Sequence, residues 1–109
     1  AKTARKGVGD YELTVRGVAS HAGVDFAAGA NAVVELARQL DRIAGFTRLE
    51  KGITVSPGGV RGGTRSNVVP AEAYAHIDIR VPTMKDGAWL EKQFRGLKPL
   101  DKRCTLELT

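Results

Sequence analysis

Apolar and polar residues alternate in three stretches of the chain, a pattern typical of β-strands that bury one face. The first stretch spans residues 9–18, the second residues 71–81 and the third residues 103–109. Small alanines occupy part of the apolar face of the second stretch, which would let a helix pack close to it. The apolar positions are Tyr11, Leu13 and Val15 in the first stretch; Ala71, Ala73, Ala75, Ile77, Ile79 and Val81 in the second; and Cys104, Leu106 and Leu108 in the third.

Apolar residues recur at helical spacing in two further stretches. The first predicted helix runs from about Asn31, a residue suited to cap a helix, to Ala44, where Gly45 supplies a stop. The second follows Thr83, whose spacing to Asp86 resembles a capping box. The helical apolar positions are Val33, Leu36, Ala37, Leu40, Ile43 and Ala44 in the first helix, and Trp89, Leu90, Phe94 and Leu97 in the second.

The remaining stretches predict a short strand and two loops. Residues 51–57 predict the strand, and residues 58–67 (GGVRGGTRSN) predict a turn or a mobile connection because they are rich in glycine. Residues 19–30 (ASHAGVDFAAGA) show no period and predict an unusually long loop, of the kind that often carries function. His21 lies in this loop.

The predicted order is strand, helix, strand, strand, helix, strand, which indicates an α+β fold of the ferredoxin-like βαββαβ type. We expect one domain over residues 1–109, with a four-stranded antiparallel sheet in the spatial order 4-1-3-2 and two helices on one face. Both chain ends would then lie on neighbouring strands, as an inserted domain requires. In this topology His21 and Asn67 are neighbours at one end of the sheet, and Arg80 lies at the other end.

The composition is that of an ordinary globular domain, with 42% hydrophobic and 27% charged residues. No apolar run is long enough for a membrane helix, and the basic N-terminal residues lack the apolar stretch of a signal peptide. We therefore expect a soluble protein without an export signal of its own, as in an internal fragment. The net charge of +5 is spread along the chain, which argues against a nucleic-acid site.

Metal chemistry is not predicted for this chain. Zinc sites need three or four clustered Cys, His, Asp or Glu ligands, whereas His21 and His76 are far apart and neither HExxH nor CxxC spacing occurs. His76 alternates with other polar residues of a strand and is expected at the surface. The glycine-rich stretch also lacks the lysine of a phosphate-binding loop.

Three segments carry a resemblance to a known family. They are VRGVASHAG at residues 15–23, ANAVVELARQL at residues 30–40 and RSNVVPAEAYAHIDIRVP at residues 65–82. Together they resemble the dimerisation, or lid, domain of the zinc metallopeptidase family that contains the folate-cleaving glutamate carboxypeptidases. The resemblance covers about residues 7–82, whereas residues 86–104 fit only by their helix-then-strand pattern.

The resemblance implies a two-domain bacterial parent whose separate catalytic domain holds two zinc ions. Such a parent is compatible with export to the periplasm. The chain itself is implied to form a homodimer and to be non-catalytic alone. His21 of the HAG motif is implied to reach the active site of the partner subunit and to stabilise an oxyanion. Asn67 and Arg80 are implied to hold the terminal carboxylate of a folate or glutamyl substrate. Imidazole, amide and guanidinium donors suit such negative groups.

We expect the homodimer to form along the second strand, residues Lys51–Ser56, and the first helix. An edge strand has unpaired backbone groups that can extend the sheet across a two-fold axis. Antiparallel pairing of two copies would bring His21 and Asn67 of one chain beside Arg80 of its partner.

Two alternatives come from other classes of protein. RNA-recognition domains share this order of elements, but they stack bases on aromatic residues of their central strands. The third strand here offers only Tyr74 and no RNP1-like pattern. The other alternative is a small-ligand regulatory domain of the same fold, which a thermal shift with amino acids and folates would separate from an assembly module.

Overall fold

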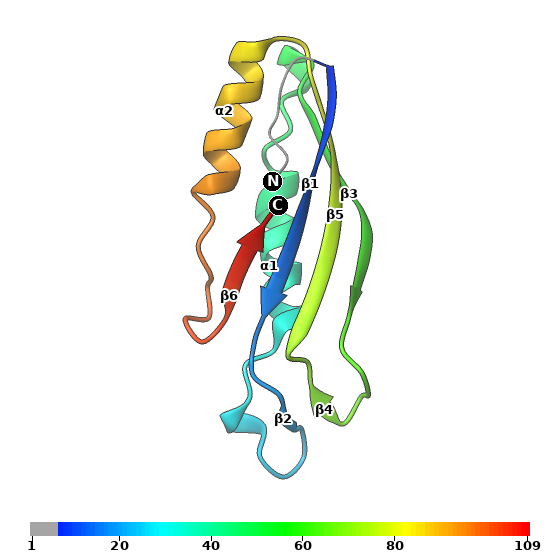
Figure 1. Ribbon diagram of the computed structural model, residues 1–109, viewed down its shortest axis with the longest axis vertical. Coiled ribbons are helices and arrows are strands. Elements are labelled where there is room, and N and C mark those ends of the chain that lie inside the picture. Colours follow the sequence, from blue (N-terminus) through cyan, green and yellow to red (C-terminus); the bar gives the residue numbers. More distant parts are fainter. Residues whose placement is uncertain (1–6) are drawn as a thin grey trace.

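A four-stranded antiparallel sheet forms the centre of the computed structural model, which describes residues 7–109. The spatial order of its strands is β3-β5-β1-β6 (Figure 1), which is the predicted ferredoxin-like order, so the predicted fold class is confirmed. The domain predicted over residues 1–109 begins with six residues that lie outside the described part. The four strands are β1 (Gly7–Arg16), β3 (Thr54–Gly62), β5 (Glu72–Val81) and β6 (Thr105–Leu108).

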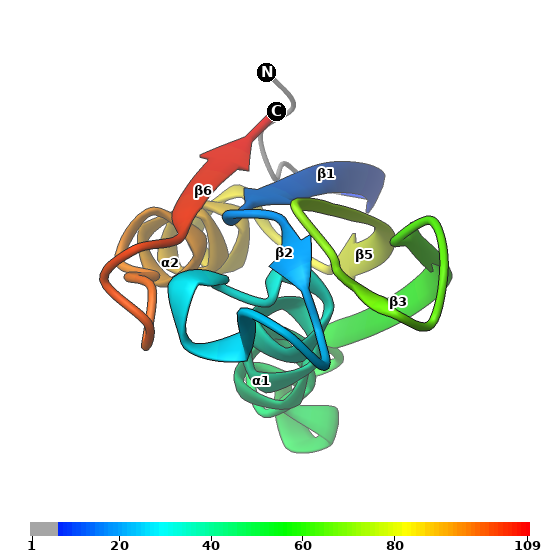
Figure 2. The same cartoon turned by 90° about the horizontal axis from the view of Figure 1, so that it is seen from below.

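Both helices pack on the same face of the sheet (Figure 2). α1 (Ala32–Ala44) begins at Asn31, whose side chain accepts hydrogen bonds from two backbone N–H groups of the first turn. α2 (Met84–Arg95) begins at Thr83, whose hydroxyl accepts the N–H of Asp86. Both predicted caps are confirmed, and each satisfies N–H groups that a helix start leaves without partners. No helix in the described part of the chain is long and apolar enough to cross a membrane.

The core lies between the sheet and the helices. Tyr11 of β1 stacks on Phe94 of α2 with ring centroids 4.1 Å apart, and Phe46 meets Phe94 edge-on at 5.5 Å. Such aromatic pairs add to the free energy gained by burying apolar area. Ala73 and Ala75 of β5 are buried, and their small side chains let α1 approach the sheet, as the alternation predicted.

The prediction for residues 51–67 is wrong in its bounds. The chain first makes a 3-10 turn, η2 (Leu49–Lys51), and β3 then continues through most of the glycine-rich stretch that predicted a mobile connection. A shift in register between Pro57 and Gly59 marks a β-bulge, which an edge strand tolerates. Gly62 is constrained, because a Cβ there would lie 2.8 Å from a side chain of β5. Pairing with β5 outweighs the preference of glycine for loops.

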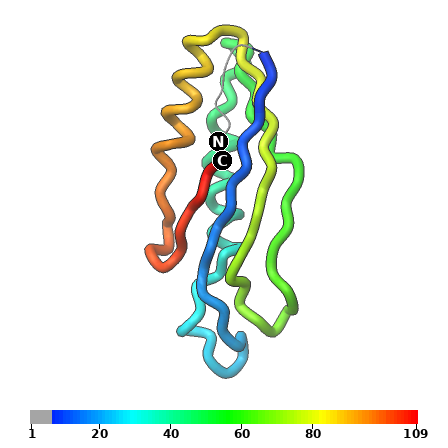
Figure 3. Tube along the Cα trace, in the orientation of Figure 1, coloured from blue at the N-terminus to red at the C-terminus, as the bar shows by residue number. Residues whose placement is uncertain are grey.

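A second, two-stranded sheet lies beyond one end of the main sheet (Figure 1), where the chain trace projects past the long strands (Figure 3). In it β2 (Ser20–His21) pairs with β4 (Val68–Val69), and the 3-10 turn η1 (Phe26–Ala28) follows β2. The long loop predicted around β2 therefore contains short regular elements that its aperiodic sequence did not indicate. We call residues 17–30 together with residues 63–70 the distal lobe, and the rest of the described chain the body.

Candidate functional site

His21 lies in β2, at the exposed surface of the distal lobe. Its Nδ1 atom accepts hydrogen bonds from the backbone N–H groups of Gly23 and Val24, at 3.1 Å and 3.0 Å. Nδ1 is therefore unprotonated in this turn, and the neutral ring carries its hydrogen on Nε2. Nε2 has no hydrogen-bond partner in the part of the chain that the structure describes, so the ring can donate to a ligand.

Asn67 lies beside His21, as the topology predicted. His21 pairs with Val68 in the two-stranded sheet, and the carbonyl oxygen of Asn67 accepts the N–H of Ala22 at 2.9 Å. The side chain of Asn67 is exposed. The lobe thus brings an imidazole and a carboxamide to one end of the molecule, and both can donate hydrogen bonds to a negatively charged group.

Arg80 lies at the opposite end of β5, which is also where the topology predicted it. Its backbone neighbours are Val8 of β1 and Thr54 of β3, and its Nε donates to the carboxylate of Asp78 at 3.2 Å. The side chain of Arg80 is 61% exposed. The 10 residues of β5, at about 3.3 Å each, separate this end from the distal lobe by roughly 30 Å. One small ligand therefore cannot contact His21 and Arg80 of the same chain.

Two glycines let the distal lobe pack tightly at its base. A Cβ at Gly17 would lie 2.0 Å from the carbonyl oxygen of Ala30, where the chain enters and leaves the lobe. A Cβ at Gly29 would lie 2.4 Å from Oγ of Ser20. Val18 and Ala30 exchange two backbone hydrogen bonds of 2.9 Å at this base. The position of the lobe thus depends on close backbone contacts, which any side chain at Gly17 would disturb.

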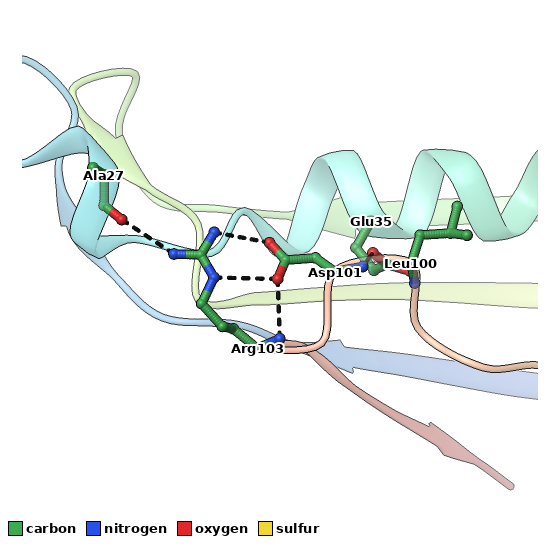
Figure 4. A network of polar contacts seen from close by, with 5 residues as sticks. All are labelled: Ala27, Glu35, Leu100, Asp101 and Arg103. Atoms are coloured by element: carbon green, nitrogen blue, oxygen red, sulfur yellow. Dashed lines mark hydrogen bonds and ion pairs between the residues drawn. The ribbon is translucent and has the colours of Figure 1, made fainter.

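A buried carboxylate on α1 was not singled out by the sequence. Glu35 is 1% exposed and lies beside Leu100 and Asp101 (Figure 4). Its carboxylate accepts the N–H groups of these two residues at 2.8 Å each, and it also accepts Nε2 of Gln39 at 2.7 Å. Burial opposes ionisation of Glu35, but these hydrogen bonds and the charge of Arg38 outweigh burial and lower its pKa. The available signal was the spacing of Glu35 and Gln39, one helical turn apart beside the apolar stripe.

Asp101 and Arg103 extend this network to the distal lobe (Figure 4). The carboxylate of Asp101 accepts Nε and Nη2 of Arg103 at 3.2 Å and 3.0 Å, and Nη1 of Arg103 donates to the carbonyl oxygen of Ala27 at 3.1 Å. The side-chain hydrogen bonds from Arg103 lower the pKa of Asp101, so the pair is ionised at neutral pH. Ala27 belongs to η1, which follows His21 in the lobe.

An exposed apolar surface lies at the free edge of the sheet, where α1 packs beside β3 (Figure 2). Val60 of β3 is 58% exposed and Val33 of α1 is 38% exposed. Ala37 and Ala44 continue the exposed face of α1 from Val33. We call these four residues the α1–β3 edge surface. Its small alanine side chains would let a second helix approach closely.

The face of the sheet opposite the helices is polar and mainly acidic. Tyr74, the aromatic residue expected on this face, is covered by Arg61, whose guanidinium lies 4.3 Å from the ring centroid. An RNA-recognition domain needs open aromatic rings and positive charge here, so the RNA-binding alternative is not favoured. The acidic residues of this face are Asp10, Glu12, Glu72, Asp78 and Glu107.

The donor set of the described residues does not fit a zinc ion. Within residues 7–109, no group of three or more His, Cys, Asp or Glu side chains could hold a metal. His76 lies at the surface and contacts the carboxylate of Asp10 at 2.6 Å. Cys104 is buried, and burial raises the pKa of its thiol, which disfavours the thiolate that binds metals.

The chain is thus a ferredoxin-like sheet with a free β3 edge, and its candidate polar residues are divided between the two ends of the sheet. Residues 3–97 match the model of the peptidase dimerisation domain of the M20 family, and the chain belongs to that family. A protein named "Probable carboxypeptidase" from Aspergillus terreus is 30% identical over 87 residues, which are 70% of this chain and 20% of that protein.

Solved structures share the fold at low sequence identity. An aminobenzoyl-glutamate utilization protein from Klebsiella pneumoniae aligns with a TM-score of 0.82 and 20% identity, over 97% of this chain and 28% of that chain. Aminopeptidase PepT from Bacillus cereus aligns with a TM-score of 0.70 and 18% identity, over 99% of this chain and 30% of that chain. The chain thus spans 20% of the curated relative and less than a third of each solved chain.

Proposed function

We propose that the chain is the homodimerisation domain of a zinc-dependent glutamate carboxypeptidase and that it supplies substrate contacts across the dimer. One observation carries this proposal: His21 and Asn67 lie at one end of the sheet and Arg80 at the other, with the β3 edge free between them. The chain alone is proposed to be non-catalytic, because its described residues provide neither a zinc site nor a complete substrate site.

β3 is the strand along which two copies would pair. Thr54 lies opposite Arg80, and Gly62 lies opposite Ala73, so β3 spans the main sheet from end to end. Antiparallel pairing across a two-fold axis would set the Thr54 end of one copy beside the Gly62 end of the other. Arg80 of one chain would then lie near the distal lobe of its partner. The same contact would bury the α1–β3 edge surface.

Each residue of this composite site has a role that suits its chemistry. His21 would donate its Nε2 hydrogen to the oxyanion that develops on the scissile carbonyl, where fixed donors stabilise the transition state. Asn67 would donate its amide, and Arg80 its guanidinium fork, to the terminal carboxylate of the substrate. Since zinc does not fit the described residues, both ions are assigned to a separate catalytic domain.

The substrate class rests on two resemblances. The HAG, NVVP and DIR motifs around His21, Asn67 and Arg80 resemble those of carboxypeptidase G, a folate-hydrolysing glutamate carboxypeptidase. Two of the relatives are named for aminobenzoyl-glutamate utilization and for carboxypeptidase activity. The first name supports a substrate that ends in a glutamate carboxylate, such as a folate or a glutamyl peptide, and the second supports cleavage at a carboxyl terminus.

Mixing two impaired variants of the parent enzyme, rebuilt by joining the chain to its catalytic domain, tests the shared site when activity is assayed at a substrate concentration below KM. His21→Ala should lower kcat by about a hundredfold with little change in KM, because the oxyanion contact forms only in the transition state. Arg80→Ala should act mainly through KM, because the carboxylate is held in both states. A heterodimer of the two variants has one site with both defects and one with neither. It should recover up to about half of the wild-type activity.

A matched control uses two variants of the same lobe. Mixing His21→Ala with Asn67→Ala should recover nothing, because each composite site then carries one of the two defects. Subunit exchange is checked in both mixtures by mass spectrometry of differently tagged chains. If exchange occurs and the mixture of His21→Ala and Arg80→Ala is no more active than the separate variants, His21 and Arg80 do not serve one site from opposite subunits.

A further inference from the structure

The turn that follows His21 is attached to the body by one described hydrogen bond. Residues 23–29 form backbone hydrogen bonds among themselves and with His21, and all of them except Gly29 are exposed. Within residues 7–109, the only hydrogen bond from this segment to any other part of the chain is the one from Arg103 to the carbonyl oxygen of Ala27. Arg103 therefore supplies the hydrogen bond that fixes the middle of this segment against the body, in addition to the backbone contacts at the two ends of the segment.

Arg103 is itself held in place by Asp101, and Asp101 is held by Glu35. Its guanidinium forms a two-point contact with Asp101, and its own N–H donates to the same carboxylate at 2.9 Å. The backbone of Asp101 is fixed by the buried carboxylate of Glu35, and Gln39 of α1 also donates to the carbonyl oxygen of Lys98 at 2.9 Å. A planar guanidinium held by such a fork loses little further entropy when it donates to Ala27.

We propose that Arg103 is a positioning residue for His21, through the series Glu35, Asp101, Arg103 and Ala27. The η1 turn is held against the body by Arg103, and Gly23 and Val24 lie between η1 and His21 in sequence. Their N–H groups occupy Nδ1 of the ring, so a fixed turn fixes which ring nitrogen carries the hydrogen. The role in catalysis rests on the function proposed for His21, whereas the mechanical link can be tested without it.

Amide hydrogen exchange in the 109-residue chain measures this link directly. Arg103→Ala should speed exchange of the hydrogen-bonded amides in residues 23–29 by roughly three- to tenfold, the effect of losing one hydrogen bond. The amides of Leu100 and Asp101 should keep their wild-type rates, because Glu35 still binds them. Glu35→Gln should speed exchange both in residues 23–29 and at Leu100 and Asp101, because it weakens the hydrogen bonds that hold the backbone of Asp101.

The matched control is Arg95→Ala, which removes an exposed ion pair with Glu91 on α2 and should leave exchange in residues 23–29 unchanged. Arg103→Lys keeps the charge but not the fork, so its effect should lie between wild type and Arg103→Ala. This variant also serves as the test protein if Arg103→Ala does not fold.

The 15N chemical shifts of the His21 ring separate positioning from a merely structural role. Above the titration range of the ring, wild-type Nδ1 and Nε2 should differ strongly, and Arg103→Ala should bring them closer because the turn no longer selects one tautomer. Unchanged exchange in residues 23–29, or a uniform increase with an unchanged ring, would overturn the proposal. Because both signals come from the isolated chain, their failure leaves the complementation test of His21 intact.

Discussion

The body and the distal lobe differ in what holds them together. In the body, Tyr11 and Phe94 are at most 2% exposed and lie in a continuous apolar core. In the lobe, Val24 and Phe26 are 83% and 69% exposed, although they are as apolar as residues that the body buries. The lobe contributes one small side chain, Ala30, to that core and is held mainly by two paired positions between β2 and β4, by the backbone contacts at its base and by the side-chain hydrogen bond to η1.

Because of this difference, one region determines the stability of the chain and the other determines the placement of its functional groups. Apolar burial contributes a large and non-directional free energy, whereas one hydrogen bond contributes only about 1 kcal/mol net. The body therefore determines whether the chain folds. The lobe can shift at little cost, so hydrogen bonds and close backbone contacts determine where His21 and Asn67 lie.

The largest contrast is expected between two phenylalanines. Phe94→Ala should lower the free energy of unfolding by about 4 kcal/mol, because it removes a buried ring and leaves a cavity under Tyr11. Phe26→Ala, the matched change in the lobe, should alter it by less than about 0.5 kcal/mol. Urea unfolding followed by circular dichroism measures both. Equal losses would show that the side chain of Phe26 is packed as tightly as that of Phe94.

A polar substitution in the body should come next in size. Glu35→Ala should lower the free energy of unfolding by about 3 kcal/mol, because it leaves the N–H groups of Leu100 and Asp101 without their acceptor. Glu91→Ala removes a carboxylate from an exposed pair on α2 and should cost less than about 1 kcal/mol. A loss for Glu35→Ala no larger than that for Glu91→Ala would mean that the network contributes no more than a surface ion pair.

The lowered pKa of Glu35 also predicts how the stability of the chain depends on pH. Burial favours its neutral form, but the hydrogen bonds prevail and the folded-state pKa lies below the ordinary value of 4.5. The unfolded state therefore binds the proton more readily, so this stabilisation is fully present above that value and is lost as the pH falls below it. Unfolding measured from neutral pH down to about pH 3 should show a shallower acid dependence in Glu35→Ala than in the wild type.

A smaller loss is expected at the junction of the two regions. Gly17→Ala places a methyl group against the carbonyl oxygen of Ala30 and should lower the free energy of unfolding by about 2 kcal/mol, because the lobe can move to relieve the clash. Gly59→Ala, where the nearest atom is the Cβ of His76 at 3.9 Å, should be nearly neutral. Exchange in residues 23–29 should rise only in Gly17→Ala, and a rise in both variants would point to a general effect of alanine.

The body was largely predictable from the sequence, because burial and capping leave local patterns. The alternation in β5 and the caps Asn31 and Thr83 are examples. The passage of β3 through Gly58 and Gly59 was not predictable, because its partner β5 lies elsewhere in the chain and pairing overrides local preference.

The candidate site divides in the same way. The topology alone placed His21 beside Asn67 and Arg80 at the far end of the sheet, because connection order decides which loops share an end. The contacts of Glu35 with residues that follow α2 could not be predicted, because the sequence around Glu35 does not indicate which distant segment packs against α1. The same holds for the bond from Arg103 to Ala27.

The molar mass of the chain in solution tests the proposed assembly most directly. Sedimentation equilibrium at micromolar to millimolar concentration should give twice the 11.6 kDa of one chain. Ala37→Arg places a charge on the α1–β3 edge surface and should give single chains, whereas Ala88→Arg, at an exposed position of α2, should remain dimeric. A wild-type chain that stays monomeric throughout this range, or an Ala37→Arg variant that still dimerises, would contradict pairing along β3 and α1.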